Sequence, residues 1–143
     1  MKTKLEKMYR DWCEAWNSHQ VEKVLSYVTD DIVYEDVPMA RVSRGKSEMK
    51  AFVTETYTAF PDFKLELKSF LASGDLASGE WVMTGKFLGE VQSAGIKPTG
   101  KSFSVRGISI AELRGDKIRR HTDYYDGATF LRQIGVMPEV QPT

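Results

Sequence analysis

The chain has 143 residues, and its 20 basic side chains balance its 20 acidic ones. This balance argues against binding to nucleic acid or to a membrane surface, because both need a clustered excess of Lys and Arg. The charged N-terminus is followed by no long apolar run, and the only cysteine, Cys13, cannot form an internal disulfide, so we expect a cytoplasmic protein. The length predicts one domain over residues 1–143.

The N-terminal part is predicted to hold two helices and a strand. Apolar side chains recur at helical spacing over residues 4–17 and again over the short stretch 21–28. Thr29-Asp30-Asp31 is expected to end the second helix and to turn the chain. Residues 32–37 then favour a strand, which a proline stops, and residues 39–44 favour a loop.

A third helix and two further strands are expected next. Ser47 is a suitable N-cap for the helix, and Pro61 forces the helix to end near Ala59. Residues 63–71 alternate apolar with charged side chains, as a half-buried strand does. Another strand is predicted over residues 77–88.

The last part of the chain predicts a hairpin that follows a glycine-rich loop over residues 89–100. A strand-like run from Ser102 to Leu113 leads into a turn with Gly115 and then into a second strand over residues 119–126. Beyond this strand, residues 129–134 favour a helical turn.

Alternation divides the last strand into two faces. It places His121, Asp123 and Tyr125 on one face, and the residues between them, with Asp126, on the other. One interpretation is a polar edge strand whose aspartates pair with neighbouring arginines, and the other is that one face floors a pocket. Helices grouped on one side of a mostly antiparallel sheet make an α+β domain, and a curled sheet would enclose such a pocket.

Four stretches in a fixed order carry a resemblance to a known family. They are Trp16-Asn17 with residues 27–34, Arg44-Gly45-Lys46-Ser47, Phe60-Pro61-Asp62-Phe63, and residues 116–135. Together they resemble the NTF2-like superfamily of nuclear transport factor 2 and the ketosteroid isomerases, and most of all its SnoaL-like polyketide cyclases. The resemblance covers nearly the whole chain. It implies an α+β cone, in which three helices and a curved, mixed, mostly antiparallel sheet enclose a cavity.

The resemblance also implies a catalytic residue. The cyclases carry an acid/base aspartate on their last strand, and this role falls on Asp123. His121 shares the face of Asp123, where it either tunes the carboxyl group or is a hydrogen-bonded polar residue without a role in catalysis. Asp126 is the alternative catalytic carboxylate, since a β-bulge would exchange the two faces. Without a bulge, Asp126 is expected to cap the turn at Gly127.

Asp36 is a further carboxylate of interest. By resemblance it stands where ketosteroid isomerases keep their general base. The rest of the isomerase set is missing, since Trp12 replaces the tyrosine of the oxyanion hole and Ser109 lies near the position of the proton-donating aspartate. Steroid isomerisation is therefore disfavoured, and Asp36 is expected either to anchor substrate or to start the turn at Pro38. The residues expected to bind substrate are Trp12, Trp16, Tyr34, Asp36, Tyr57, Trp81, Ser109 and Tyr125.

The leading functional hypothesis is a cofactor-independent cyclase, lyase or isomerase. It would act on a small carbonyl or polyketide-like substrate by aldol or enolisation chemistry in an apolar cavity. One alternative is an epoxide or ester hydrolase of the same fold, although the Asp-Arg-Asp set of limonene epoxide hydrolases is not evident near Arg106. The other alternative is a non-catalytic module for ligand binding or dimerisation.

The expected partners follow from the same patterns. No metal-ligand spacing, phosphate loop or dinucleotide fingerprint is present, so neither a metal nor a cofactor is expected. We expect a small hydrophobic or polyketide-like molecule as ligand, and neither nucleic acid nor a membrane. A homodimer would cover the outer face of the sheet, with Arg106, Ile108 and Ile110 as the contact row.

Overall fold

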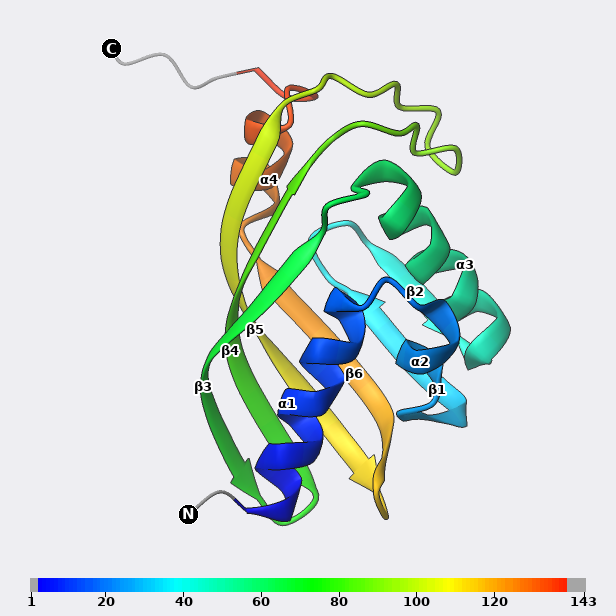
Figure 1. Cartoon of the computed structure of the whole chain (residues 1–143), viewed down its shortest axis with the longest axis vertical. Helices are drawn as coiled ribbons and strands as arrows, with labels where there is room; N and C mark the ends of the chain where they lie inside the picture. Colours follow the sequence, from blue (N-terminus) through cyan, green and yellow to red (C-terminus); the bar gives the residue numbers. More distant parts are fainter. Residues whose placement is uncertain (1–2, 139–143) are drawn as a thin grey trace.

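The computed structural model describes residues 3–138, which form four helices and six strands (Figure 1). The helices are α1 (Lys4–Asn17), α2 (Val21–Leu25), α3 (Gly45–Ala59) and α4 (Gly127–Gln133). The strands are β1 (Val28–Asp36), β2 (Arg41–Arg44), β3 (Lys64–Ser73), β4 (Leu76–Lys86), β5 (Ser102–Arg114) and β6 (Lys117–Tyr125).

The six strands lie in one curved sheet, in the order β2-β1-β6-β5-β4-β3. β1 and β6 run parallel, and the other neighbouring strands run antiparallel. α1 lies across the sheet and contacts β3, whereas α3 packs against β1 and β2 (Figure 1). The α+β class and the mixed, mostly antiparallel sheet are therefore confirmed, with α4 as a fourth helix beside β5.

The first helix buries one face against the sheet. Its buried stripe consists of Tyr9, Trp12, Cys13 and Trp16, which follow the spacing of one helical face and are each at most 4% exposed. At the C-terminal end, the side-chain amide of Asn17 donates to the carbonyl oxygen of Leu65 at 2.8 Å and accepts from its N–H at 2.6 Å. Asn17 therefore ends the helix and also fixes its position against β3.

Two expectations for the N-terminal half are wrong. β1 begins at Val28, so Thr29-Asp30-Asp31 lies inside the strand rather than in a turn. Arg41–Arg44, expected to be part of a loop, forms the edge strand β2. The reason is tertiary pairing. Tyr34 pairs with Ser43 in an antiparallel ladder, and the short polar segment has no local pattern that predicts this pairing.

The start of α3 also differs from the expectation. The helix begins at Gly45, whose φ of +84° lets β2 turn directly into the helix. Arg44 therefore occupies the cap position, and its backbone N–H donates to the Glu48 carboxylate at 3.0 Å. Ser47 lies within the first turn and is not the cap.

Alternation along β5 and β6 follows the predicted pattern. Phe103, Val105, Ser109, Ala111 and Leu113 are buried on the inner face of β5. On the outer face, Ile108 is 47% exposed and Ile110 is 49% exposed. On β6, His121 and Asp123 both point inward and are buried.

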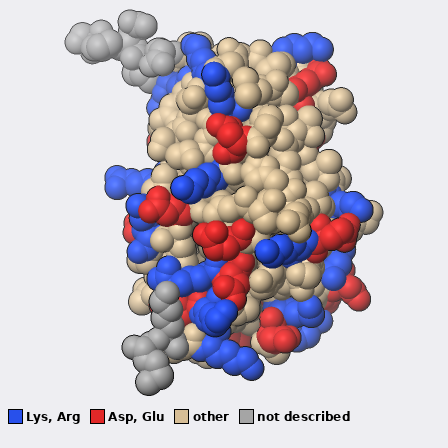
Figure 2. Space-filling model, viewed as in Figure 1, with Lys and Arg blue, Asp and Glu red and all other residues tan. Residues whose placement is uncertain are grey.

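The surface carries charges of both signs. On the face seen in Figure 2, Lys and Arg are interspersed with Asp and Glu rather than gathered in one patch. Among the described residues, no helix combines the length and apolar character needed to cross a membrane.

Dimerisation through the outer sheet face stays a prediction, and it is testable. Replacing Ile108 and Ile110 together with Glu should convert the dimer into a monomer in sedimentation at roughly 50 µM, because charge would enter an apolar contact. Leu88→Glu changes an apolar side chain that is 51% exposed in the loop after β4, outside the sheet, and it should leave the dimer intact. A monomeric wild type at that concentration would contradict the expectation.

Candidate functional site

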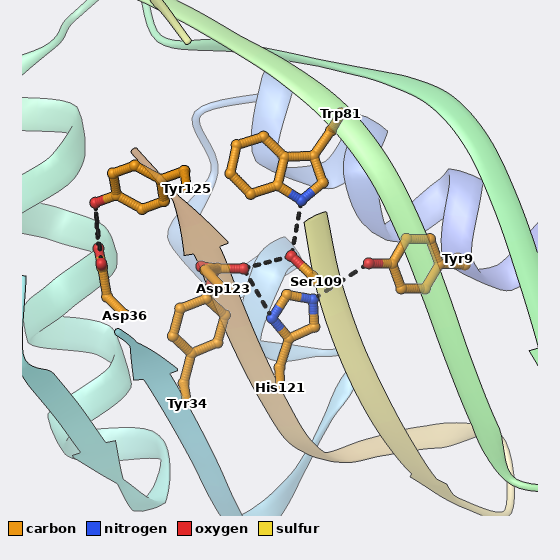
Figure 3. A network of polar contacts seen from close by, with 8 residues as sticks. All are labelled: Tyr9, Tyr34, Asp36, Trp81, Ser109, His121, Asp123 and Tyr125. Atoms are coloured by element: carbon orange, nitrogen blue, oxygen red, sulfur yellow. Dashed lines mark hydrogen bonds and ion pairs between the residues drawn. The ribbon is translucent and has the colours of Figure 1, made fainter. Parts of the chain in front are cut away.

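A cavity of about 280 Å³ lies between α1, α3, the inner face of the sheet and the loop after β4. Its wall is mainly aromatic and aliphatic, and includes Trp12, Trp16, Phe52, Trp81, Met83 and Phe130. Polar side chains are few, and those on the sheet form two groups, one around Asp123 and one that joins Asp36 to Tyr125 (Figure 3). This combination of an apolar wall with a few convergent polar groups is typical of small-molecule sites.

Asp123 on β6 is the centre of the network. Its Oδ1 accepts a hydrogen bond from Ser109 Oγ at 2.6 Å, and its Oδ2 accepts one from the Tyr34 hydroxyl at 2.5 Å (Figure 3). The indole N–H of Trp81 donates to Ser109 Oγ at 2.7 Å. Because the serine hydroxyl has one proton, the tryptophan fixes the direction in which Ser109 donates. Three strands besides β6 thus hold one buried carboxyl group.

The Tyr34 and Tyr9 hydroxyls are neutral in this site. Burial raises the pKa of both phenols well above the ordinary value, and the charge of Asp123 adds to the shift. Both tyrosines therefore keep their protons at neutral pH. Tyr9 extends the network, with its hydroxyl 3.4 Å from His121 Nε2.

His121 packs between aromatic rings beside Asp123. Its ring stacks on that of Tyr34, with centroids 4.9 Å apart and an angle of 8° between the planes. Its Nδ1 lies 3.3 Å from Asp123 Oδ1, close enough for an ion pair but without the alignment of a hydrogen bond. The imidazole is thus positioned next to the carboxyl group and completely enclosed.

Asp36, at the end of β1, is a second buried carboxyl group in the cavity wall. The Tyr125 hydroxyl lies 2.9 Å from its Oδ1 and 3.0 Å from its Oδ2, and the Met39 N–H donates to Oδ1 at 3.2 Å. Burial and, to a smaller extent, the charge of Asp123 raise the pKa of Asp36 to about 7, against the opposing effects of Tyr125, Met39 and Arg41.

The polar residues at the solvent side of the cavity form a separate cluster. Arg41 Nη1 on β2 lies 2.6 Å from Glu55 Oε1 on α3, and Ser93 Oγ in the loop after β4 donates to the same oxygen at 2.8 Å. The Arg41 guanidinium also lies 5.1 Å from the centre of the Phe52 ring. These contacts join β2, α3 and the loop around the opening.

The structure brings most of the predicted site residues together. Those that line the cavity are Asp123, His121, Trp12, Trp16, Tyr34, Asp36, Trp81, Ser109 and Tyr125. Tyr57 does not line it, because its hydroxyl points to the backbone and donates to the Trp16 carbonyl at 2.7 Å. Asp126 is also outside, where its side chain caps α4 by accepting from the Thr129 N–H at 3.0 Å.

Some residues of the site are not indicated by the sequence patterns. Tyr9 lies three positions before Trp12 on the same helical stripe, and that spacing was the available signal. Arg41 and Glu55 gave no signal, since Arg41 fell in an expected loop and Glu55 on a helix rich in charge. Within residues 3–138, His, Cys, Asp and Glu do not gather in groups of three or more that suit a metal.

The fold is that of the NTF2-like class, in which a curved sheet and helices enclose a cavity. Among solved structures, AclR of Streptomyces galilaeus superimposes with a TM-score of 0.80 at 23% identity, over 96% of this chain and 88% of that one. A ketosteroid isomerase-like protein of Catenulispora acidiphila gives 0.79 at 21% identity, over 92% and 94%.

The family itself follows from sequence comparison. The profile of the SnoaL-like polyketide cyclases matches residues 6–134, and the chain belongs to this family. Aklanonic acid methyl ester cyclase AcmA of Streptomyces galilaeus is 26% identical over 129 residues, which are 88% of this chain and 87% of AcmA. The family indicated by the four sequence stretches is thereby confirmed.

Ser109→Ala should destabilise the protein by about 1–3 kcal/mol, because the buried Trp81 N–H would lose its acceptor and Asp123 a donor. Chemical denaturation measures the change. Ser104→Ala, at an exposed position on the same strand, should cost less than about 0.5 kcal/mol. Equal effects of the two changes would mean that the Trp81–Ser109–Asp123 chain contributes nothing to stability.

The raised pKa of Asp36 predicts a pH-dependent stability. Folding favours its protonated form, so this stabilisation is complete below the ordinary pKa of 3.8 and is lost as the pH rises through about 7. Asn has no proton to lose. Asp36→Asn should therefore gain stability relative to wild type between pH 4 and pH 8, on the order of 2–4 kcal/mol.

Asp126→Asn is the matched control for this titration. Hydrogen bonds from Thr129 lower the pKa of Asp126, so its contribution to stability appears as the pH rises above the folded-state pKa. The Asn variant should thus lose stability relative to wild type as the pH rises, opposite in sign to Asp36→Asn. Thermal unfolding at several pH values measures both changes. If the stability of the two variants relative to wild type changed in the same direction as the pH rises, the raised pKa of Asp36 would be refuted.

Proposed function

We propose that this protein closes a ring in a polyketide-like carbonyl substrate by an intramolecular aldol reaction, with Asp123 as the base. The observation that carries the proposal is a carboxylate fixed by hydroxyl donors at the floor of an apolar cavity. Membership of the SnoaL-like polyketide cyclase family supports it. The likeness to AcmA suggests aklanonic acid methyl ester as the first substrate to test.

The chemistry requires a base held close to a carbon acid. An ionised Asp123 would take the proton from the carbon between or beside carbonyl groups, and the resulting enolate would attack a second carbonyl of the same molecule. Holding both ends of one molecule in an enclosed cavity supplies much of the acceleration through proximity. The neutral hydroxyl of Tyr9 borders the same space and is suited to donate to a developing enolate oxygen, whereas the single proton of the Tyr34 hydroxyl is directed at Asp123.

The cavity volume bears on the substrate. A volume of about 280 Å³ is near the lower end of the range of small-molecule pockets, roughly 300–1,000 Å³. It suits a compact molecule or the reactive end of a longer one, with the rest passing Arg41 and Glu55 at the opening. Trp12, Trp16 and Trp81 offer flat walls for an aromatic ring system.

Hydrolysis of an epoxide is less well supported. The known chemistry of that reaction in this fold uses an arginine between two aspartates. Arg106 is on the outer face of β5 and exposed, as the alternation predicted, and Arg41 is paired with Glu55 at the opening. Neither guanidinium lies against Asp123, so ring closure remains the preferred function.

The role of Asp123 can be tested by substitution. Asp123→Asn keeps the shape of the side chain and should lower the rate of ring closure of aklanonic acid methyl ester by roughly 10²–10⁴-fold, the usual contribution of a positioned base. Product formation is followed by chromatography. Asp126→Asn should retain the wild-type rate, because Asp126 lies outside the cavity. Undiminished ring closure by Asp123→Asn would remove this residue from the mechanism.

A further inference from the structure

Two carboxyl groups, rather than one, occupy the floor of the cavity. Asp36 and Asp123 are direct partners in the parallel pairing of β1 with β6, and neighbouring strands lie about 4.8 Å apart. Both side chains line the cavity, with exposures of 7% and 8%. Both carboxyl groups thus face the cavity from neighbouring strands, each with its own hydrogen-bond partners (Figure 3).

The surroundings of the two groups differ. Separate hydroxyl donors, Ser109 and Tyr34, are directed at the two oxygens of Asp123, which suits an acceptor. At Asp36, a single hydroxyl, that of Tyr125, is shared between both oxygens, and the Met39 N–H donates to Oδ1 alone. Burial and the charge of Asp123 raise the pKa of Asp36 to about 7. Environments that separate the behaviour of two neighbouring carboxyl groups are a means of assigning one as acid and the other as base.

We propose that Asp36 is the acid of the reaction, donating a proton to the oxygen of the acceptor carbonyl while Asp123 removes the proton from the nucleophilic carbon. This inference rests on the proposed function and divides its proton transfers between two residues. The geometry that supports it is the pairing of the two strands, which places an acid and a base side by side at the same surface of the substrate.

The step is balanced. Asp123 takes the proton of the carbon acid, and the electron pair of that C–H bond forms the new bond to the acceptor carbonyl carbon. The π electrons of the acceptor move to its oxygen, which takes the proton of Asp36. The product is a hydroxyl-bearing ring isomeric with the substrate, and Asp123 is left protonated and Asp36 ionised. Exchange with water at the opening restores the starting state of both.

Coupling between the two charges assists this transfer. While Asp123 is ionised, its charge holds the proton on Asp36. When Asp123 receives the substrate proton, that effect vanishes, and Asp36 becomes a better donor at the moment when it must release its proton. Arg41 on β2 and Tyr125 on β6 act in the opposite sense on Asp36, and Glu55 on α3 offsets the charge of Arg41.

Tyr125 is a positioning residue in this scheme. Its hydroxyl faces both oxygens of Asp36, and its ring is packed against Trp81 and Phe130, with centroid separations of 6.1 and 6.0 Å. Its hydrogen bond lowers the pKa of Asp36. Tyr125→Phe should therefore move the titration of Asp36 to higher pH while leaving the acid in the site.

The kinetic test separates the two halves of the reaction with aklanonic acid methyl ester in D₂O. Asp36→Asn should retain exchange of the acidic C–H protons within about threefold and lose ring closure by roughly 10²–10⁴-fold, whereas Asp123→Asn should lose both. Glu35→Gln, one residue away and on the opposite face of β1, should behave as wild type. Wild-type ring closure by Asp36→Asn, or equal loss of exchange and closure, would overturn the assignment.

A second measurement needs no substrate. The ¹³C carboxyl resonance of Asp36, identified by its absence in Asp36→Asn, should titrate near pH 7 in wild type, at lower pH in Asp123→Asn and at higher pH in Tyr125→Phe. Titration in the ordinary range of an aspartate would overturn the inference even if no substrate is turned over. A wild type with the expected titration but neither exchange nor ring closure would instead count against the proposed function and retain the acid character of Asp36.

Discussion

The structure depends on the burial of the Asp123 carboxyl group in an apolar cavity. A buried carboxylate is costly unless donors surround it, and here the donors come from three different strands: Tyr34 from β1, Ser109 from β5 and, through Ser109, Trp81 from β4. The strand order β1-β6-β5-β4 brings these residues side by side. The sheet topology therefore makes the polar network possible. The aromatic face of α1 covers the network through Tyr9 and Trp12, whose rings pack against His121.

The parallel pairing of β1 with β6 gives the site its second carboxyl group. It joins the first strand of the chain to the last, and it sets Asp36 beside Asp123 at the strand ends. The edge strand β2 and the loop after β4 then surround the opening, where Arg41, Glu55 and Ser93 are linked. Arg41 is the strand partner of Asp36, so this ion pair lies next to the groups suited to proton transfer.

Much of this arrangement could be predicted from the sequence, because alternation and helical spacing are local. They placed Asp123 and His121 inward, Ile108 and Ile110 outward, and Trp12 and Trp16 on one stripe. Strand pairing is not local, so β2 was taken for a loop and the link between Tyr34 and Asp123 had no signal. Tyr57 was expected in the cavity because spacing gives a face of a helix but not the direction of a hydroxyl. Alternation assigned Asp126 to the face opposite Asp123, and this holds because β6 continues to Tyr125 without a bulge after Asp123.

The most direct test of Asp123 as the base is a crystal structure of the Asp123→Asn variant with aklanonic acid methyl ester bound. If Asp123 is the base, the acidic carbon of the ligand should lie about 3–3.5 Å from the side chain of residue 123, inside the cavity formed by α1 and the sheet. A ligand bound in that cavity with its acidic carbon out of reach of residue 123, or a ligand bound only outside the cavity, would contradict the account.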